Sequence, residues 1–470
     1  MRLPLKGKPL LYFETEVTLM SYTIAAIATP LSPAGLGVIR LSGDDAIAIA
    51  DSLFRGSKTL TSLSGYQAAY GHVTDADGDI DDCVALVFRA PHSYTGEDTV
   101  EFSCHGGTYI LRRVLRAAIA AGAKPAAGGE FTRRAFLNGK MDLSGAEAVM
   151  DLIAAEGKIA AKSALSAREG ALYRKLDEVK TVLVGLSAQI AAFIDYPDDD
   201  VPPLPSDELV ETLETAACTL ERLLATADAG RILTSGIDTA IIGAPNVGKS
   251  TLMNLLSGCE RSIVTDIAGT TRDVVEETVL LGDVRLRLAD TAGLHDTADT
   301  VERIGVQKAR ERLEQAALVL AVFDSSRPFG DEDADLLASL AGKIAVAILN
   351  KTDLCDTVPT ALQESGLPLV ALCAKDGNGL DALTEAVAAV TGIAALTGDE
   401  PLLANERQRI GAARCLESIH AAIAALSSGL AEDAAAVCID EALAAVLELT
   451  GERVSDTVVQ EVFSRFCVGK

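Results

Sequence analysis

Tryptophan is absent from this 470-residue sequence, and aromatic residues of any kind make up only 4% of it. Long hydrophobic runs are missing too. The apolar segments 316–323 and 344–349 have the length of strands, whereas a membrane-spanning helix needs roughly 18 to 20 apolar residues. Although the mean hydropathy is +0.26, these absences exclude a membrane-spanning protein. With 49% apolar residues available for buried cores, the sequence predicts a soluble, folded protein rather than a disordered one.

Basic residues are scarce relative to acidic ones. The 41 lysines and arginines face 67 aspartates and glutamates, which gives a formal net charge of −26. A surface this acidic repels phosphate backbones at long range. The imbalance therefore excludes a protein that coats nucleic acid through a dense basic face, but it leaves room for a confined basic site.

Cysteine pairing is another feature that the sequence lacks. The nine cysteines are scattered without a C-x-x-C pair, and an odd number in a long chain is not a disulfide framework. We therefore expect a reducing, cytoplasmic compartment. At the amino end, Pro9, Glu14 and Glu16 leave no apolar core for a signal peptide. Residues 1–20 are interpreted as a disordered extension or an early start, because Met20 precedes a clean strand pattern.

Composition changes along the chain suggest about three domains. Residues 21–140 mix short β-rich runs with helical periodicity, which predicts an α+β domain. Residues 141–234 and 394–470 carry helical periodicity throughout and predict an all-α domain. Between them, residues 235–393 alternate strands with helices, which is typical of a doubly wound, mostly parallel sheet. We expect this α/β unit to be inserted into the helical domain.

A phosphate-binding loop stands at the start of the α/β unit. Gly243-Ala-Pro-Asn-Val-Gly248-Lys249-Ser250 fits G-x-x-x-x-G-K-S/T and lies between a predicted strand and a predicted helix, as this motif must. Its glycines let backbone N–H groups surround phosphates, and the helix dipole favours the negative charge. Lys249 would supply charge to the β- and γ-phosphates, and the Ser250 hydroxyl would bind Mg²⁺.

Three further motifs follow in the order that a GTP-binding domain requires. Asp290-Thr-Ala-Gly293 closes a strand, where its carboxylate can hold Mg²⁺ through water. The aspartate of Asn350-Lys351-Thr352-Asp353 can accept hydrogen bonds from guanine N1–H and the 2-amino group, whereas adenine has neither donor. Cys373-Ala374-Lys375 fits the last loop around the base. The nucleotide is therefore predicted to be GTP.

The remaining catalytic groups are less certain from the residues alone. Residues 265–273 (TDIAGTTRD) suit a switch loop, in which either Thr270 or Thr271 would be a metal ligand. Leu294 stands where Ras-like enzymes use a glutamine to orient the attacking water, and its apolar side chain cannot do so. Five residues of the following loop are candidates for that role, without a choice among them: His295, Asp296, Asp299, Glu302 and Arg303.

Seven segments together give the chain, from about Tyr22 to Lys470, a resemblance to the MnmE (TrmE) family of tRNA-modification GTPases. They are GLGVIR (35–40), SYTGED (93–98), HGG (105–107), GEFTRRAFLN (129–138), the phosphate-binding loop with Asn246, residues 265–273, and the terminal Phe466-Cys-Val-Gly-Lys470. The tail departs from the family's FCIGK only by Val468, a change that should not alter the chemistry.

The resemblance implies a homodimeric GTPase whose amino-terminal domain also mediates dimerisation and binds formyl- or methylene-tetrahydrofolate. With an FAD-dependent partner, MnmG, it would add an aminomethyl or carboxymethylaminomethyl group to C5 of the wobble uridine of certain tRNAs. By resemblance, Arg40, Glu101, Lys140 and Lys470 would contact the folate. Arginine and lysine suit glutamate and formyl oxygens, and a carboxylate suits the donors of the pterin ring. Cys467 stays open, since such a cysteine is usually only packed.

For the G domain, the resemblance implies a K⁺ ion beside the phosphates that acts in place of an arginine finger when two G domains meet. Its ligands would be Asn246, Thr265, the Ile267 carbonyl and Thr270, with Thr271 left for Mg²⁺ beside Ser250. The catalytic residues would be Lys249 and Glu302, the latter orienting the attacking water. The full expected nucleotide-binding set is Asn246, Val247, Gly248, Lys249, Ser250, Thr251, Thr265, Asp266, Ile267, Ala268, Gly269, Thr270, Thr271, Asp290, Thr291, Ala292, Gly293, Asn350, Lys351, Asp353, Cys373, Ala374 and Lys375.

Two other functions remain open at this stage. A ribosomal-RNA-binding GTPase would need an appendage such as a KH domain, and no G-x-x-G clamp occurs in a basic carboxy-terminal domain. A stand-alone folate-dependent one-carbon transferase would use GTP only for regulation. The clusters Arg112-Arg113-x-x-Arg116 and Arg133-Arg134 are candidates for contact with tRNA or a partner, although such arginines are more often solvated helix charges. If the protein binds tRNA alone, we expect weak, salt-sensitive binding.

Overall fold

A computed structural model describes most of the chain: residues 12–13, 22–195, 206–258, 277–288, 314–428, 432–464, 466 and 468–469. The chain divides into two compact units. The first unit comprises Met1–Met150, Arg168–Ala216 and Glu417–Lys470, and the second comprises Asp151–Ala167 and Ala217–Leu416. Each is described by itself.

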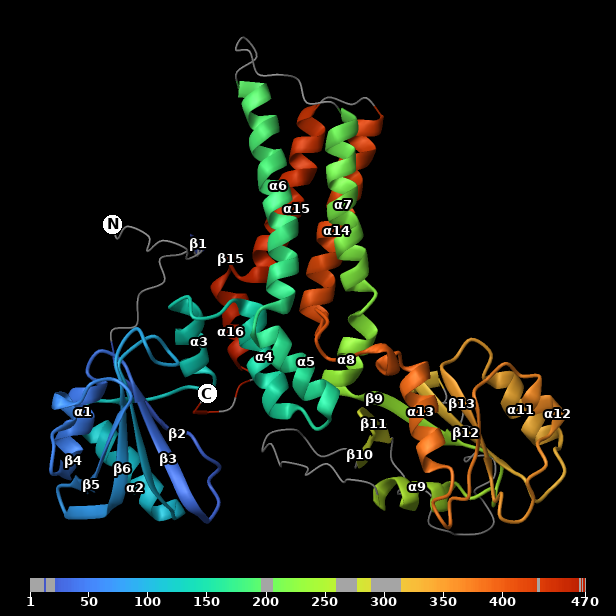
Figure 1. Ribbon diagram of the computed structural model, residues 1–470, viewed down its shortest axis with the longest axis horizontal. Coiled ribbons are helices and arrows are strands. Elements are labelled where there is room, and N and C mark those ends of the chain that lie inside the picture. Colours follow the sequence, from blue (N-terminus) through green and yellow to red (C-terminus); the bar gives the residue numbers. More distant parts are fainter. Residues whose placement is uncertain are drawn as a thin grey trace. The chain divides into compact units, whose positions relative to one another are not determined.

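The first unit contains a seven-stranded sheet in the order β4-β5-β6-β7-β3-β2-β8. Its strands are β2 (Ile24–Ile27), β3 (Ala34–Ser42), β4 (Phe54–Gly56), β5 (Gln67–Asp75), β6 (Gly78–Phe88), β7 (Thr99–Gly106) and β8 (Lys124–Pro125). All neighbouring pairs are antiparallel except β2 with β8. Helices α1 (Ala46–Leu53) and α2 (Thr108–Ala120) place Ile47 and Leu111 in one hydrophobic core with strand residues of this sheet (Figure 1).

Strand alternation separates this core from a polar face. In β7, Val100, Phe102 and Cys104 are buried, whereas Glu101 between them points to the other face. In β3, Arg40 likewise lies between buried Ile39 and Leu41 and pairs directly with Glu101 in the ladder. Because successive side chains of a strand point to opposite faces, the two charged residues lie together on the face opposite the core.

The carboxyl-terminal segment of the chain packs back on the amino-terminal region. Helices α3 (Glu130–Leu137), α4 (Leu143–Ala154) and α16 (Asp456–Ser464) share a core of Phe136, Leu143, Val459, Phe463 and Phe466. Gly129, which directly precedes α3, has a φ of +69°, and a Cβ there would lie 2.7 Å from the Phe463 carbonyl oxygen. Glycine is therefore required at this close approach. Beyond α16, Val468 forms a β-bridge with Gly128.

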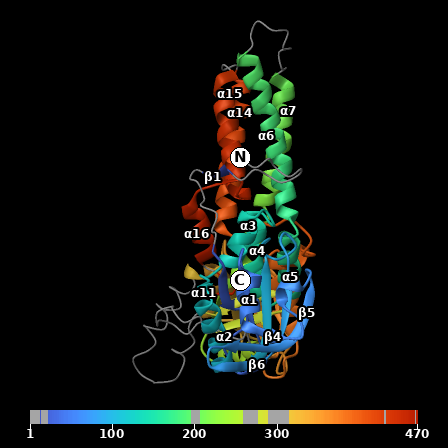
Figure 2. The same ribbon diagram turned by 90° about the vertical axis from the view of Figure 1, so that its left-hand side faces the viewer.

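Two long helices of the first unit, α6 (Ala171–Asp195) and α15 (Glu432–Thr450), run side by side (Figures 1 and 2). Buried residues recur along each helix with alternating spacings of four and three. They are Leu172, Leu176, Val179, Leu183, Leu186 and Ile190 in α6, and Ala435, Ile439, Ala442, Val446 and Leu449 in α15. A repeat of about 3.5 residues keeps one seam of each helix turned toward its neighbour, as in coiled coils.

Several further elements are short or cross the boundary between the units, and they belong to neither unit's main sheet. They are β1 (Tyr12–Phe13), which pairs in parallel with β15 (Arg453–Val454), the 3-10 helices η1 (Leu60–Ser62) and η3 (Ile393–Ala395), and the helices α5 (Lys158–Arg168), α7 (Ser206–Leu224), α8 (Ala227–Ser235) and α14 (Glu406–Ser427). None of the described helices is long and apolar enough to cross a membrane.

The second unit is built on a six-stranded sheet in the order β10-β11-β9-β12-β13-β14. The strands are β9 (Ile237–Ile242), β10 (Glu277–Leu281), β11 (Val284–Leu288), β12 (Leu318–Asp324), β13 (Ala345–Asn350) and β14 (Leu369–Ala371), and the helices are α9 (Lys249–Gly258), α11 (Asp331–Ser339), α12 (Thr360–Gln363) and α13 (Leu380–Val390). Only β10 and β11 are antiparallel. Strand β13 is buried along its whole length, as expected for a parallel strand covered on both faces.

The predicted fold class is confirmed: an α+β amino-terminal domain, a helical domain, and an inserted α/β P-loop domain. The sequence did not predict β10, although its apolar residues and the Gly282-Asp283 turn are typical of a hairpin. The exact domain boundaries stay a prediction.

Candidate functional site

The phosphate-binding loop connects β9 to α9 in the second unit. Helix α9 begins at Lys249, so its free N–H groups face the loop. Two positive φ angles, +63° at Asn246 and +102° at Gly248, turn the backbone around the loop. A Cβ on Gly248 would lie only 2.2 Å from the Asn350 side-chain nitrogen. The loop is therefore closed against the neighbouring strand end, and only glycine fits there.

Lys249 is held inside this loop by the loop's own carbonyl groups. Its Nζ donates to the carbonyl oxygens of Gly243 at 3.0 Å and Ala244 at 2.8 Å. Burial lowers the pKa of Lys249, because the charged form loses water and pairs with no carboxylate among the described residues. Phosphate oxygens would supply the missing negative charge, so the lysine is positioned to bind the phosphates of a nucleoside triphosphate. Ser250 and Thr251 follow it on α9 and are exposed.

Asn350 joins three loops at the carboxyl ends of the parallel strands. Its Nδ2 donates to the Val247 carbonyl oxygen at 2.8 Å, and its Oδ1 accepts from the Ala374 N–H at 3.0 Å. The residue is 2% exposed. One side chain therefore fixes the phosphate-binding loop and the Cys373–Ala374 turn relative to each other. Asp353 and Lys375 are exposed beside it, where a base could meet them.

Lys351 is positioned by a residue that the sequence reasoning missed. Its Nζ donates to the Asn246 carbonyl oxygen at 2.8 Å and to Asp324 Oδ2 at 2.6 Å. Burial acts to raise the pKa of Asp324, but the hydrogen bond from Lys351 and those from Ser326 outweigh it and hold this pKa below its usual value. Asp324 is the last residue of β12, at the same sheet edge as the predicted motifs. That position was a signal that could have identified it.

A second charged group lies in the first unit, around Arg40. Its Nε donates to Glu101 Oε1 at 2.8 Å, and its Nη1 donates to the Gly469 carbonyl oxygen at 3.3 Å. The guanidinium lies 5.7 Å from the Tyr94 ring centre and 5.6 Å from that of Phe131. Three of the segments that carry the family resemblance therefore meet the carboxyl-terminal tail at one point. Lys140 does not join this ion pair and instead donates to the Pro91 carbonyl oxygen at 3.0 Å.

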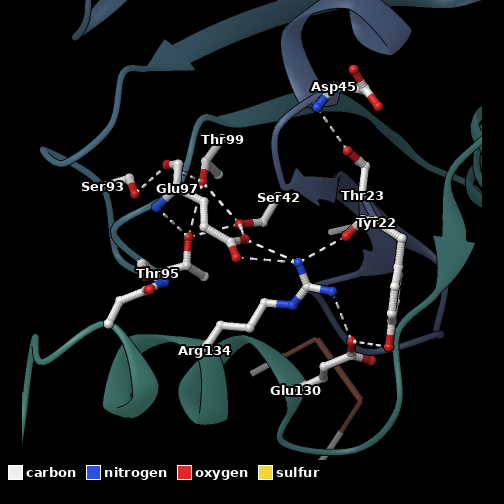
Figure 3. Close-up of polar contacts among 11 residues, drawn as sticks. Tyr22, Thr23, Ser42, Asp45, Ser93, Thr95, Glu97, Thr99, Glu130 and Arg134 are labelled. Atoms are coloured by element: carbon white, nitrogen blue, oxygen red, sulfur yellow. Dashed lines mark hydrogen bonds and ion pairs between the residues drawn. The ribbon is translucent and has the colours of Figure 1, made fainter. Parts of the chain in front are cut away.

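A buried polar network of the first unit is centred on Arg134 (Figure 3). Arg134 is 2% exposed. Its Nη1 donates to Glu97 Oε2 at 3.1 Å and to the Tyr22 carbonyl oxygen at 3.0 Å, and its Nη2 donates to Glu130 Oε1 at 3.0 Å. Glu97 also accepts from Ser42 at 2.8 Å. Neither interpretation of Arg134, as a contact with tRNA or a partner or as a solvated helix charge, is right, because it is buried between two carboxylates from different parts of the chain.

Several predicted site residues lie outside the described residues. They are Thr265, Asp266, Ile267, Ala268, Gly269, Thr270, Thr271, Asp290, Thr291, Ala292, Gly293, Glu302, Cys467 and Lys470. Of the predicted nucleotide set, the structure brings together the phosphate-binding loop, the Asn350–Asp353 loop and the Cys373–Lys375 loop. Of the predicted folate set, it brings together Arg40 and Glu101.

A doubly wound sheet with this loop, followed by the Asn-Lys-x-Asp loop at the same edge, defines a P-loop GTP-binding protein. Family models extend the assignment: the "MnmE helical domain" matches residues 143–467 and the "GTP-binding protein TrmE N-terminus" matches residues 23–140. The chain belongs to the MnmE family and is a GTP hydrolase.

Curated relatives match along nearly their whole length. The tRNA modification GTPase MnmE of Symbiobacterium thermophilum is 44% identical over 95% of this chain and 99% of its own. The MnmE of Chloroflexus aurantiacus is 42% identical over 96% of this chain and 100% of its own. Among solved structures, the G domain of the T. maritima FeoB iron transporter aligns with 33% of this chain and 98% of its own, at 27% identity and a TM-score of only 0.25. The full-length relatives, not this partial likeness, carry the assignment.

Proposed function

We propose that this chain is a K⁺-stimulated GTPase, activated when two G domains meet, that modifies tRNA. With an FAD-dependent MnmG partner it adds an aminomethyl or carboxymethylaminomethyl group to C5 of the wobble uridine of certain tRNAs, using a one-carbon unit of tetrahydrofolate. The observation that carries this proposal is full-length similarity to relatives that are named tRNA modification GTPases. We also propose a cytoplasmic location, because the scattered cysteines suit a reducing compartment.

The proposed GTP site assigns a role to each loop. Lys249 and the start of α9 bind the β- and γ-phosphates, while Ser250 and Thr271 hold Mg²⁺. Asp353 accepts the two donors of guanine, beside the loop that Asn350 fixes. Lys351 connects the base-binding loop to the phosphate-binding loop through its contacts with Asp324 and Asn246. Glu302 orients the attacking water. Ras-like enzymes use a glutamine for this task at the position of Leu294, whose apolar side chain cannot perform it.

A K⁺ ion is proposed beside the phosphates, with Asn246, Thr265, Ile267 and Thr270 as its oxygen ligands. Asn246 supports this assignment. Its backbone carbonyl is used by Lys351, but its exposed side-chain amide makes no hydrogen bond to the described part of the chain. Its oxygen is thus available to a cation at the rim of the phosphate-binding loop. The ion would supply positive charge to the transition state.

The folate site is proposed around Arg40, Glu101, Lys140 and Lys470. The residues present fit such a ligand, because Arg40 and Glu101 form a half-buried charged pair beside the aromatic rings of Tyr94 and Phe131. A carboxylate suits the amino-pyrimidine donors of a pterin, and a guanidinium suits its carbonyl or carboxylate oxygens. Burial raises the pKa of Tyr94, which keeps its hydroxyl neutral against Thr132. Bound folate would supply the one-carbon unit.

We propose a homodimer formed through the amino-terminal domain. Large apolar side chains are exposed on this domain, among them Leu31 at 50%, Leu36 at 69% and Tyr70 at 66%. A homodimer interface that covers these side chains would remove their apolar surface from water.

GTP turnover measured in KCl and in NaCl tests the proposed mechanism. At equal ionic strength, turnover in KCl is expected to exceed that in NaCl by at least tenfold, because Na⁺ is too small for ligands spaced for K⁺. Binding of a fluorescent GDP analogue, measured in both salts, is the control and should differ little. Equal turnover rates would remove K⁺ and the charge it supplies from the mechanism.

A further inference from the structure

The outward face of α2 carries an aromatic residue and two arginines in one stripe. Tyr109, Arg112 and Arg116 are spaced by three and four residues, which places them on the same side of the helix. The opposite side, with Leu111, is buried against the sheet. Tyr109 is 72% exposed, an unusual degree for a large aromatic side chain.

The charges of this stripe are largely uncompensated. Arg113, on the flank, is held by Asp75 through two hydrogen bonds of 2.8 Å, which raise the pKa of Arg113. Arg112 and Arg116 make no ion pair with any residue that the structure describes. This contrasts with Arg40, Arg55, Arg89, Arg134, Arg285, Arg287, Arg327 and Arg409, each of which pairs with a carboxylate. Within the described part of the chain, two unpaired guanidinium groups thus lie on one helix face of a protein of net charge −26.

The stripe also surrounds a hollow of about 210 Å³, lined by Thr108, Tyr109, Arg112, Arg113 and Arg116. Its chemistry is that of an RNA contact. Unstacked bases stack on exposed aromatic rings, and guanidinium groups bind phosphate oxygens through two hydrogen bonds. Arg113 lines the same hollow while its guanidinium is held by Asp75.

We propose that the α2 stripe, defined as Tyr109, Arg112 and Arg116, is a contact site for the tRNA substrate. Tyr109 stacks on a base, and the two arginines bind the flanking phosphates. The contact is small, because acidic residues lie beside it. Asp75 is neutralised by its ion pair with Arg113, but Asp77 on the same hairpin is exposed and repels phosphate at the edge of the stripe. The inference rests on the proposed function for the choice of tRNA, and it explains how an acidic protein meets an acidic substrate.

Binding of fluorescent tRNA to the full-length protein, measured by anisotropy over a KCl series, tests the stripe. Each lost phosphate contact should lower the slope of log Kd against log [KCl] by about 0.7 to 0.9. R112A/R116A should therefore flatten the slope by roughly 1.4 to 1.8 and weaken binding at low salt at least tenfold. Y109A should weaken binding without changing the slope, and Y109F should restore it, since stacking needs the ring and not the hydroxyl.

The double variant K58A/R222A is the matched control, because it removes two exposed cations elsewhere. It should change affinity less than twofold, and all variants should keep wild-type GTP turnover and thermal unfolding. If R112A/R116A matches K58A/R222A in slope and affinity, the stripe is not a tRNA contact, even if it then proves to bind the partner protein. If the wild-type protein binds no tRNA at 50 mM KCl, with or without its partner, the stripe and the proposed tRNA function both fail.

Discussion

Asp324 shows how one carboxylate prepares the guanine site. It accepts from Lys351 at 2.6 Å, while Lys351 itself is held at a φ of +63°. Ser325 reinforces the same turn, since its hydroxyl donates to the Lys351 carbonyl oxygen at 2.8 Å. A non-glycine residue rarely adopts this backbone conformation unless its surroundings fix it. Asp324 is therefore a positioning residue for the base-binding loop.

The change Asp324→Asn should weaken binding of a fluorescent GDP analogue by roughly ten- to a hundredfold, because a hydrogen bond to a charged group is worth about 1.5 to 3 kcal/mol. Asp335→Asn, an exposed aspartate on α11, is the control and should leave affinity unchanged. The pKa of Asp324 is lowered in the folded protein, so the pair with Lys351 is complete above the ordinary aspartate pKa. The difference in affinity between the wild type and Asp324→Asn should therefore persist from pH 8 to pH 5, because Asp324 stays ionised in that range. A difference that disappears within that range would contradict the role of Asp324.

Substitution of the neighbouring residues Arg134 and Arg133 tests whether the buried polar network stabilises the domain. Arg134→Ala leaves Glu97 and Glu130 buried without their cation, which should cost about 3 to 5 kcal/mol of unfolding free energy. Arg133→Ala removes a neighbouring guanidinium that has no partner among the described residues, and it should change stability by less than about 1 kcal/mol. Urea unfolding of both variants provides the comparison. Equal losses would show that the network does not stabilise the domain.

The strands and helices were largely predictable from the sequence, but the burial of polar side chains was not. Periodicity identified β3, β7, β12 and β13, because each alternates or forms an apolar run of strand length. Motif spacing identified the phosphate-binding loop and the Asn350–Asp353 loop. Arg134 could not be placed in this way, since its partners Glu97 and Tyr22 are 37 and 112 residues away. Long-range pairing of that kind leaves no local pattern.

The heptad seam between α6 and α15 gives a prediction for whole elements. Leu183→Ala, at a position that is 0% exposed, should cost about 2 to 5 kcal/mol of unfolding free energy through lost burial and a residual cavity. Its neighbour Val184 is 47% exposed, so Val184→Ala should cost less than about 0.5 kcal/mol. Chemical unfolding followed by helical circular dichroism distinguishes them. Similar costs for both variants would mean that α6 does not pack through this seam.

For the whole molecule, the net charge of −26 restricts how nucleic acid can bind, but it does not exclude binding. Such a charge argues against an extended, sequence-independent grip on nucleic acid, but it permits a small contact of a few arginines. Several described arginines, such as Arg40 and Arg134, are neutralised by carboxylates within the fold, whereas Arg112 and Arg116 form no ion pair with a described residue. The acidic surface thus confines tRNA to particular sites instead of excluding it.

The central claim is that GTP hydrolysis by this chain serves tRNA modification. The direct measurement is mass spectrometry of wobble nucleosides in tRNA from bacteria that lack their own family member and express either this chain or its Lys249→Ala variant. The wild-type chain should restore the aminomethyl-type uridine, and the variant should not, because it loses its phosphate-binding charge. Immunoblots must show equal amounts of both proteins. Unmodified wobble uridine in cells that contain the wild-type chain and an FAD-dependent MnmG protein would contradict the account.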